Sequence, residues 1–174
     1  MMLSGKEIER EHNNGRIYIS DFNPSRINPN SYNLRLADEI LMYCSPILDM
    51  KKENQTKKIT IPESGLILFP GTLYLGRTHE RTNTDSYISR IVGRSSIGRL
   101  GLSVHITADF GDIGFNGCWT LSMSCLLPVK IYPLVEICQI YYEEIKGEYN
   151  LYNSYKYQNN NEVQPSKLYK DFLK

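Results

Sequence analysis

The sequence predicts a mainly β protein with a barrel or jelly-roll core and one short helix at its N-terminus. Short segments rich in isoleucine, leucine, tyrosine and threonine follow one another from residue 23 onward, separated by prolines. This pattern is typical of many short strands in a compact β architecture. The separating prolines are Pro24, Pro29, Pro46, Pro62 and Pro70. Because 174 residues can bury a core without metal or disulfide support, we expect one domain over residues 1–174.

The opening helix is predicted by a capping pattern. Ser4 precedes the segment KEIEREHNN, and Glu7 follows the serine at the spacing of a capping box. A serine hydroxyl at this position can accept a hydrogen bond from a free backbone N–H of the first turn. We therefore expect a helix to begin directly after Ser4.

The strands are predicted from the segments SYNLRL, KKITI, GLILF and TLYLGRT. The later segment VKIYPLVEICQIYYEEI continues the pattern and is expected to break at Pro133. The charged stretch KKENQTKK, between Met50 and Ile59, predicts a solvated loop. From Gly147 the chain is rich in tyrosine, asparagine and lysine, which is compatible with a short helix or an ordered arm.

Charge and cysteine content exclude several classes of function. A net charge of +1 argues against a nucleic-acid-binding surface, which needs clustered excess lysine and arginine. The apolar runs are shorter than the roughly 20 residues of a membrane span, so we expect no membrane segment. The cysteines are far apart and no signal peptide precedes them, which predicts buried thiols in a reducing, cytoplasmic setting. They are Cys44, Cys118, Cys125 and Cys138.

The segment GRSSIGRLGLSVHITADFGDIGFNG, from Gly93 to Gly117, carries the clearest functional signal. Its first part combines the guanidinium of Arg94 with the hydroxyls of Ser95 and Ser96. Neighbouring glycines lack side chains and let backbone N–H groups approach an anion closely. This combination predicts a phosphate-binding site.

The second part of the segment offers groups suited to a base and a sugar. After Arg99, the alternating run LSVHIT ends in a turn-rich stretch in which Asp112 can bind a sugar hydroxyl and Phe115 can stack on a ring. The order along the chain therefore indicates phosphates, then base, then sugar. We interpret His105, a lone histidine in the alternating run, as a packed and hydrogen-bonded core residue.

The motif GRSSIGRLGL, followed by VHITA and GDIGF, resembles the dCTP deaminase family of the dUTPase-like superfamily, which includes bifunctional dCTP deaminase/dUTP diphosphatases. Further matches run almost end to end. They are MLSGKEI at Met2–Ile8, INPNSYNLRL at Ile27–Leu36, PGTLYLGRT at Pro70–Thr78, VEICQI at Val135–Ile140, and KYQ with PSKLYKDF near the C-terminus. The resemblance implies a dUTPase-like distorted β-barrel, a C-terminal arm of residues 147–174 that folds over the nucleotide, and a homotrimer with sites at subunit boundaries.

The resemblance also implies roles for residues at the phosphate and catalytic positions. Arg94, Ser95, Ser96 and Lys156 would bind the triphosphate, and Tyr157 and Gln158 would complete the tail motif that reaches the phosphates and sugar. Arg99 would enter the catalytic site and position the attacked base carbon and its water.

For the nucleoside, the resemblance implies that main-chain groups of Thr107 and Ala108 read the edge of the pyrimidine. Asp112 would contact the 3′-hydroxyl and, in diphosphatases, orient the attacking water. Phe115 would pack on the deoxyribose and disfavour a 2′-hydroxyl. The expected small-molecule ligands are dCTP, dUTP or dTTP.

One departure from the family concerns the reaction itself. The family pattern WTLE carries the glutamate that transfers protons during deamination, whereas this chain reads WTLS and has Ser122 there. A hydroxyl is not a comparable base near neutral pH, and loss of a general base costs about two to four orders of magnitude in rate. The acidic candidate nearby in the sequence is Asp109, where the family more often has glycine or histidine.

Three functions remain open at this stage. The first is hydrolytic deamination of dCTP to dUTP, with further conversion to dUMP. The second is a dUTP diphosphatase in which Asp112 orients water and Mg²⁺ is held through the nucleotide phosphates, without direct protein ligands. The third is a catalytically silent dCTP- or dUTP-binding regulator, or a variant inactivated at Ser122. Zinc chemistry is not expected, because the HxE and PCxxC ligand signatures of zinc deaminases are absent from the sequence.

Overall fold

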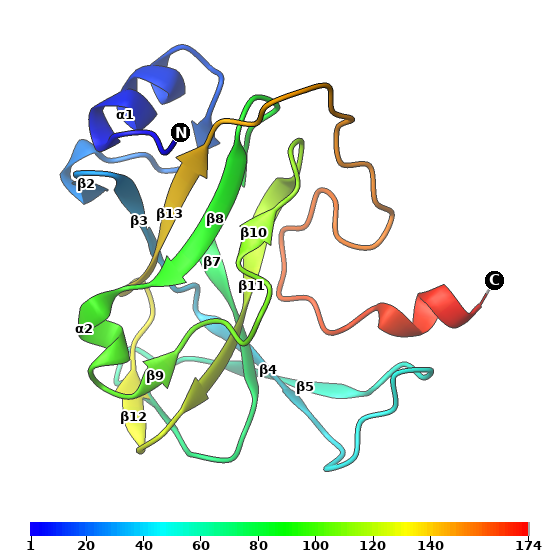
Figure 1. The fold of residues 1–174 in the computed structure, drawn as a ribbon. Coiled ribbons are helices and arrows are strands. Elements are labelled where there is room, and N and C mark those ends of the chain that lie inside the picture. Colours follow the sequence, from blue (N-terminus) through cyan, green and yellow to red (C-terminus); the bar gives the residue numbers. More distant parts are fainter. Residues whose placement is uncertain (174) are drawn as a thin grey trace.

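The computed structural model describes residues 1–173 and shows a mainly β protein built from antiparallel strands (Figure 1). Two large sheets and one small ribbon enclose a shared hydrophobic core. The expected distorted β-barrel with a short N-terminal helix and an ordered C-terminal arm is confirmed.

The strands divide among three sheets. The first sheet has the order β5 (Thr56–Thr60), β4 (Glu39–Tyr43), β7 (Tyr74–Asn83), β11 (Asn116–Cys125) and β9 (Leu102–Ser103), and β1 (Tyr18–Ile19) also pairs with β7. The second has the order β10 (Phe110–Gly111), β8 (Ile88–Gly93), β13 (Glu136–Glu143), β3 (Ser31–Arg35) and β2 (Ile27–Asn28). The ribbon pairs β6 (Leu66–Leu68) with β12 (Val129–Ile131).

Helical segments are short and lie outside the sheets. The N-terminal helix α1 (Gly5–Asn13) begins as expected, because the Ser4 hydroxyl accepts a hydrogen bond from the backbone N–H of Glu7 at 3.2 Å. The helix α2 spans Ser95–Gly98. Two 3₁₀ segments are η1 (Pro24–Arg26) and η2 (Leu168–Phe172).

The predicted strand segments all form strands, with one correction to a loop. The charged stretch KKENQTKK was expected to be solvated throughout, but β5 already begins at Thr56, where it pairs with Tyr43. The lysines of β5 project from an edge strand and therefore tolerate pairing while staying solvated. The break expected at Pro133 is present, since β12 ends at Ile131 and β13 begins at Glu136.

The core is apolar and lies between the two large sheets. Alternation along the strands places branched and aromatic side chains inward, and each fully buried one contributes about 1.5–3 kcal/mol. Its fully buried members include Ile8, Tyr32, Leu34, Ile40, Ile91, Leu121, Met123, Ile140 and Tyr142. Three of the four cysteines are buried thiols, and Cys44 is exposed. None of the helices within residues 1–173 is both long and apolar enough to cross a membrane.

A bulge in β7 interrupts its pairing with β11. The register shifts between Cys118, which faces Arg81, and Thr120, which faces Arg77, so β7 has extra residues there. The Thr78 hydroxyl fills the gap in the ladder by accepting from the backbone N–H of Trp119 at 2.9 Å and donating to the carbonyl of Glu80 at 2.8 Å. A bulge of this kind redirects the side chains beside it.

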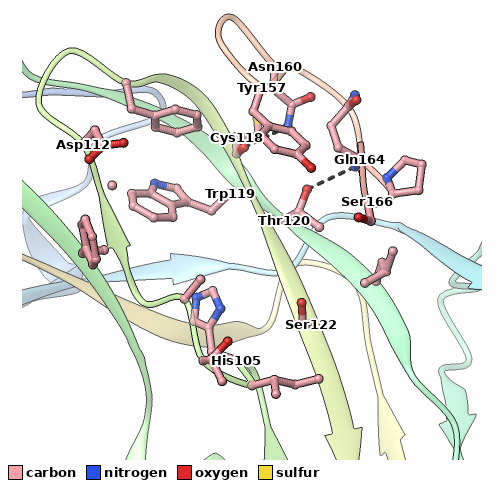
Figure 2. Close-up of a pocket in the computed structure, with 18 of the residues that line it drawn as sticks. His105, Asp112, Cys118, Trp119, Thr120, Ser122, Tyr157, Asn160, Gln164 and Ser166 are labelled. Carbon is pink, nitrogen blue, oxygen red and sulfur yellow. Dashed lines mark hydrogen bonds between the residues drawn. The ribbon is translucent and has the colours of Figure 1, made fainter. Parts of the chain in front are cut away.

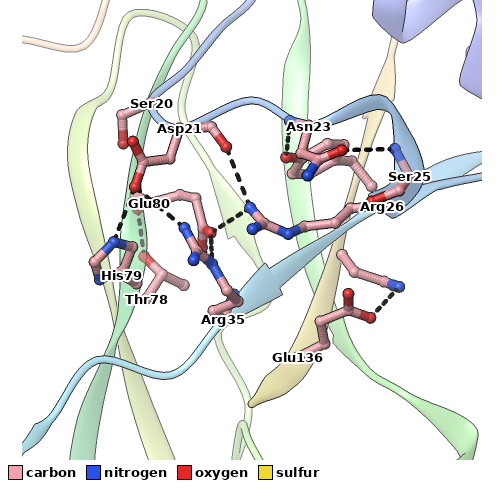
Figure 3. A network of polar contacts seen from close by, with 12 residues as sticks. Ser20, Asp21, Asn23, Ser25, Arg26, Arg35, Thr78, His79, Glu80 and Glu136 are labelled. Carbon is pink, nitrogen blue, oxygen red and sulfur yellow. Dashed lines mark hydrogen bonds and ion pairs between the residues drawn. The ribbon is translucent and has the colours of Figure 1, made fainter. Parts of the chain in front are cut away.

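The bulge turns Glu80 inward, where it joins the two sheets (Figure 3). Its side chain is 0% exposed and accepts from Arg35 of β3 through Nε at 2.6 Å and from the Arg35 backbone N–H at 2.7 Å. Arg26 adds a contact at 3.2 Å, and Asp21 holds the far side of Arg35 at 3.2 Å. The carboxylate is therefore paired on both oxygens, as a buried charge requires.

Replacing Glu80 with glutamine should lower the free energy of unfolding by about 3–5 kcal/mol, because two largely buried guanidinium groups lose their shared counter-charge. Urea denaturation followed by circular dichroism measures the change. The matched control is Glu63→Gln, since Glu63 is exposed. Equal denaturation midpoints for the two variants would show that the network does not hold the sheets together.

Candidate functional site

A cavity of about 470 Å³ lies between β11, the segment of residues 105–115 and the C-terminal arm (Figure 2). It gathers six residues that the sequence analysis singled out. They are Thr107, Ala108, Asp112, Phe115, Ser122 and Tyr157. The nucleoside-facing residues expected from the sequence are thus brought together in one chain.

The floor of the cavity is formed by residues of β11. Thr120 and Ser122 are two residues apart and project from the same face of the strand, and both line the cavity. Ser122 pairs with Leu75 of β7, which also lines the cavity. The Thr120 hydroxyl accepts a hydrogen bond from the backbone N–H of Gln164 at 3.1 Å, which attaches the arm to this floor.

An aromatic cluster forms the end of the cavity near Asp112. Phe115 lies 5.3 Å from Trp119 and 6.1 Å from Tyr152 between ring centroids. Trp119 is fixed by a hydrogen bond from its indole N–H to the Thr82 hydroxyl at 2.9 Å. Gly111 of β10 packs directly on this indole, since a methyl group at that position would lie 2.5 Å from the Trp119 ring. Such a surface suits stacking on a sugar or a base.

The C-terminal arm, residues 147–173, runs on the side of β10 and β11 (Figure 1) and contributes part of the cavity lining of its own chain. Beside the β7 bulge, the backbone N–H of Cys118 donates to the Asn160 carbonyl at 2.8 Å, and the Asn160 side chain donates to the Cys118 carbonyl at 3.1 Å. Gln158 donates to the Gly114 carbonyl at 2.7 Å and accepts from the Asn116 N–H at 2.9 Å. Gln158, proposed from the sequence to contact the nucleotide, therefore binds the main chain here.

The phosphate-binding candidates lie elsewhere in the chain. Arg94 caps α2, which Figure 1 shows on the opposite side of the molecule from the arm. Its guanidinium donates to the Glu136 carbonyl at 2.9 Å and pairs with the Glu136 carboxylate at 3.3 Å. The cavity lining includes none of the candidates in this segment, which are Arg94, Ser95, Ser96 and Arg99.

Lys156 lies in the arm and is also not part of the cavity lining. Its ammonium pairs with the Asp171 carboxylate at 2.5 Å, and this hydrogen bond raises the lysine pKa. Within residues 1–173, no lysine or arginine lines the cavity. The described lining of one chain's cavity thus lacks the positive charge that a triphosphate requires.

Asp109, the acidic candidate from the sequence, lies in the wall rather than on the cavity surface. Its carboxylate pairs with Arg90 of β8 at 3.1 Å, and Arg90 also pairs with Glu143 at 3.0 Å. Its backbone carbonyl accepts from the Ile91 N–H at 2.6 Å. Asp109 therefore anchors the segment that carries Thr107.

His105 occupies a position that the sequence analysis did not expect. It lines the cavity, and its Nε2 atom is buried without a hydrogen-bond partner within the described residues, so the hydrogen-bonded core role is wrong. Burial lowers the pKa of the imidazole below its ordinary value. The available signal was the place of His105 two residues before Thr107, which the sequence analysis had assigned to the base. Tyr43, Asn160 and Gln164 of the lining were also missed, because the arm's path sets their positions.

The described residues include no cluster of three or more histidine, cysteine, aspartate or glutamate side chains that could hold a metal ion. The cavity contributes a single carboxylate, that of Asp112. A hard cation such as Mg²⁺ binds through one or two carboxylates together with substrate phosphates. The lining is compatible with that mode of binding.

Comparison with known proteins gives consistent matches. A family model described as dCTP deaminase-like matches residues 2–145. A relative from Hathewaya histolytica is 61% identical over 172 residues, 99% of each chain, and one from Clostridium botulinum strain Eklund 17B is 61% identical over 174 residues, 100% of each. Both bear the name "dCTP deaminase, dUMP-forming".

A solved structure shares the fold at lower sequence similarity. The 2'-deoxycytidine 5'-triphosphate deaminase from Agrobacterium tumefaciens superposes with a TM-score of 0.64 at 16% identity. The match covers 81% of this chain and 47% of that one, so this chain spans about half the length of that protein. This likeness supports the arrangement of the strands.

Replacing Gly117 with alanine should release the arm from β11, because the added methyl group would lie 2.8 Å from the backbone carbonyl oxygen of Asn160. Amide hydrogen exchange in residues 150–165 should then become at least about tenfold faster, the change expected from a loss of roughly 1.4 kcal/mol in local stability. Gly98→Ala is the control, since a methyl group there meets no atom within 4 Å. Unchanged exchange in the Gly117 variant would contradict the close approach of arm and strand.

Proposed function

Because this chain belongs to the dCTP deaminase-like family, we propose that it binds pyrimidine deoxynucleoside triphosphates and hydrolytically deaminates dCTP to dUTP, with further conversion to dUMP. The observation that carries this proposal is the gathering of Thr107, Ala108, Asp112 and Phe115 around one cavity. Relatives named for this reaction match the chain along its whole length. Such a protein would act on the cytoplasmic nucleotide pool.

In the proposed complex the nucleoside lies across the cavity. The pyrimidine faces the main chain of Thr107 and Ala108, near Ser122, and the sugar packs on Phe115. The Asp112 carboxylate accepts a hydrogen bond from the 3′-hydroxyl. Contact between the Phe115 ring and the sugar leaves no space for a 2′-hydroxyl, which favours deoxynucleotides.

We further propose that the phosphate-binding groups come from a neighbouring copy in a homotrimer. A triphosphate is strongly anionic, and the cavity of one chain has no cationic lining within residues 1–173. The phosphate candidates lie in α2 or directly at its ends, on the side of the molecule away from the arm. They are Arg94, Ser95, Ser96 and Arg99. A closed symmetric ring brings such a surface of one subunit to the cavity of the next. Lys156 would reach the phosphates after leaving Asp171.

The proposed metal requirement follows from the same chemistry. Mg²⁺ would be held mainly by the nucleotide phosphates, where it neutralises charge during release of diphosphate. Asp112 is the carboxylate available to orient water for that step. No zinc is needed for either step.

The substitution at Ser122 weakens one of the two steps. Deamination requires a group that takes a proton from water as it attacks C4 and returns protons to the leaving amine. Ser122 does not titrate near neutral pH, so deamination should be slow. A dUTP diphosphatase is the second candidate function, because attack at the phosphates does not use this position. A nucleotide-binding regulator would show neither reaction.

Restoring glutamate at Ser122 should raise the rate of dCTP deamination by about 10²- to 10⁴-fold, because it supplies the missing proton acceptor. Products of dCTP, and separately of dUTP with Mg²⁺, are followed by anion-exchange chromatography. Ser122→Gln is the matched control, since it has the size of glutamate without its basicity. If every variant binds nucleotide without turnover, both enzymatic functions are rejected and the nucleotide-binding regulator is the function that remains.

Replacing Arg94 with alanine should weaken dUTP binding by about 10- to 100-fold, the effect of losing one charge-assisted contact to a phosphate. Isothermal titration measures the affinity, and sedimentation velocity measures the assembly state. Arg10→Ala is the control, because Arg10 is an exposed arginine on α1. A monomer that binds dUTP with unchanged affinity after loss of Arg94 would refute the shared site.

A further inference from the structure

We propose that His105 accepts and returns the protons of deamination in this chain, in place of the glutamate that Ser122 replaces. This inference rests on the proposed function, because it concerns the same cavity and the same substrate. It assigns the proton transfer to a residue that the family pattern does not use for it. Three features of the cavity support it.

The first feature is the position of His105 beside β11. β9 pairs with β11 through Leu102 and Ser103 and ends there. His105 follows the end of β9 by two residues, and Figure 2 shows its ring at the same end of the cavity as Ser122. Both side chains line the cavity. The fold thus directs an imidazole toward the position from which the glutamate is missing.

The second feature is the distribution of titratable groups around the cavity. Figure 2 shows His105 and Ser122 at one end and Asp112 at the other. The Cys118 thiol is a poor acceptor, because burial raises its pKa. The tyrosines of the lining carry phenol hydroxyls, which lack the basic ring nitrogen of an imidazole. Asp109 is bound to Arg90 in the wall.

Among residues 1–173, His105 is therefore the one group at the Ser122 end that can take a proton near neutral pH. An arginine contributed by a neighbouring subunit could stabilise charge there but could not accept a proton, because guanidinium stays protonated in proteins. The assignment consequently holds for the single chain and for the proposed trimer.

The third feature is that burial favours the neutral imidazole and that its Nε2 atom makes no hydrogen bond within the described residues. Burial lowers its pKa, and the nearby charge of Asp109 partly opposes that shift. A neutral imidazole carries one nitrogen lone pair that can accept a proton. The Ser122 hydroxyl can both donate and accept, which suits it to holding the attacking water.

The proton transfers balance with His105 as the carrier. Water attacks C4 of cytosine, a C4–O bond forms, and one water proton passes through the imidazole to N3 as the C4=N3 electron pair moves to N3. The remaining hydroxyl proton then passes through the imidazole to the amino nitrogen. The C4–N bond breaks, ammonia leaves and the C4=O bond forms. The imidazole ends neutral, and the products are dUTP and ammonia.

The test measures three quantities on the same preparations: deamination of radiolabelled dCTP with enzyme in excess, hydrolysis of dUTP with Mg²⁺, and dCTP affinity. His105→Gln should lower the deamination rate at least about 10²-fold, the effect of removing a general base. dUTP hydrolysis and dCTP affinity should stay within about twofold of the parent. A merely structural role would lower all three together.

Chemical rescue provides a second readout. His105→Ala should lose deamination and regain at least about tenfold of it in added imidazole, whereas the parent should not respond. In a Ser122→Glu background, His105→Gln should change the deamination rate less than about threefold, because the carboxylate then carries the protons. Equal deamination by the parent and His105→Gln, including no deamination by either, would overturn the assignment of His105. A parent that neither binds dCTP nor hydrolyses dUTP would overturn the proposed function, and this inference with it.

Discussion

The bulge in β7 is the constraint on which the rest of the structure depends. Successive residues of a strand direct their backbone N–H and C=O groups to opposite sides. Beside the bulge, Trp119 therefore bonds to Thr78 of β7, and the backbone of Cys118 bonds to Asn160 of the arm. The same bulge buries Glu80 between the guanidinium groups that connect the sheets. The bulge thus accompanies two contacts that hold the structure together, the Thr78 hydrogen bonds within the first sheet and the Glu80 ion pairs between the sheets.

The cavity and the phosphate candidates lie on different sides of the chain. Within residues 1–173, the lining of the cavity is aromatic and polar and includes no lysine or arginine. The phosphate candidates lie in and beside α2, and among them Arg94 pairs with Glu136. In the proposed trimer this division of charge would couple ligand binding to subunit assembly, because neither surface alone would neutralise a triphosphate. It also leaves the empty cavity free of mutually repelling cations.

The two proposed reactions would use different groups of the same cavity. Deamination would depend on a proton carrier beside the base, near Ser122, whereas attack on the phosphates would depend on water oriented by Asp112 and on a metal held by the phosphates. A change at the base end can therefore weaken one reaction while leaving the other intact. His105 follows β9, and both His105 and Ser122 line this cavity.

The sequence by itself determined the β class, the capped N-terminal helix and the strand segments, and it named six residues that line one cavity. These depend on local patterns, since capping, alternation and proline breaks act over a few residues. Only the tertiary structure decided that Gln158 binds the main chain at Gly114, that Asp109 pairs with Arg90 and that His105 lines the cavity. It also set the phosphate candidates apart from the cavity. Those outcomes depend on strand register, on the β7 bulge and on the path of the arm, which bring together residues distant in the chain and leave no local signature in the sequence.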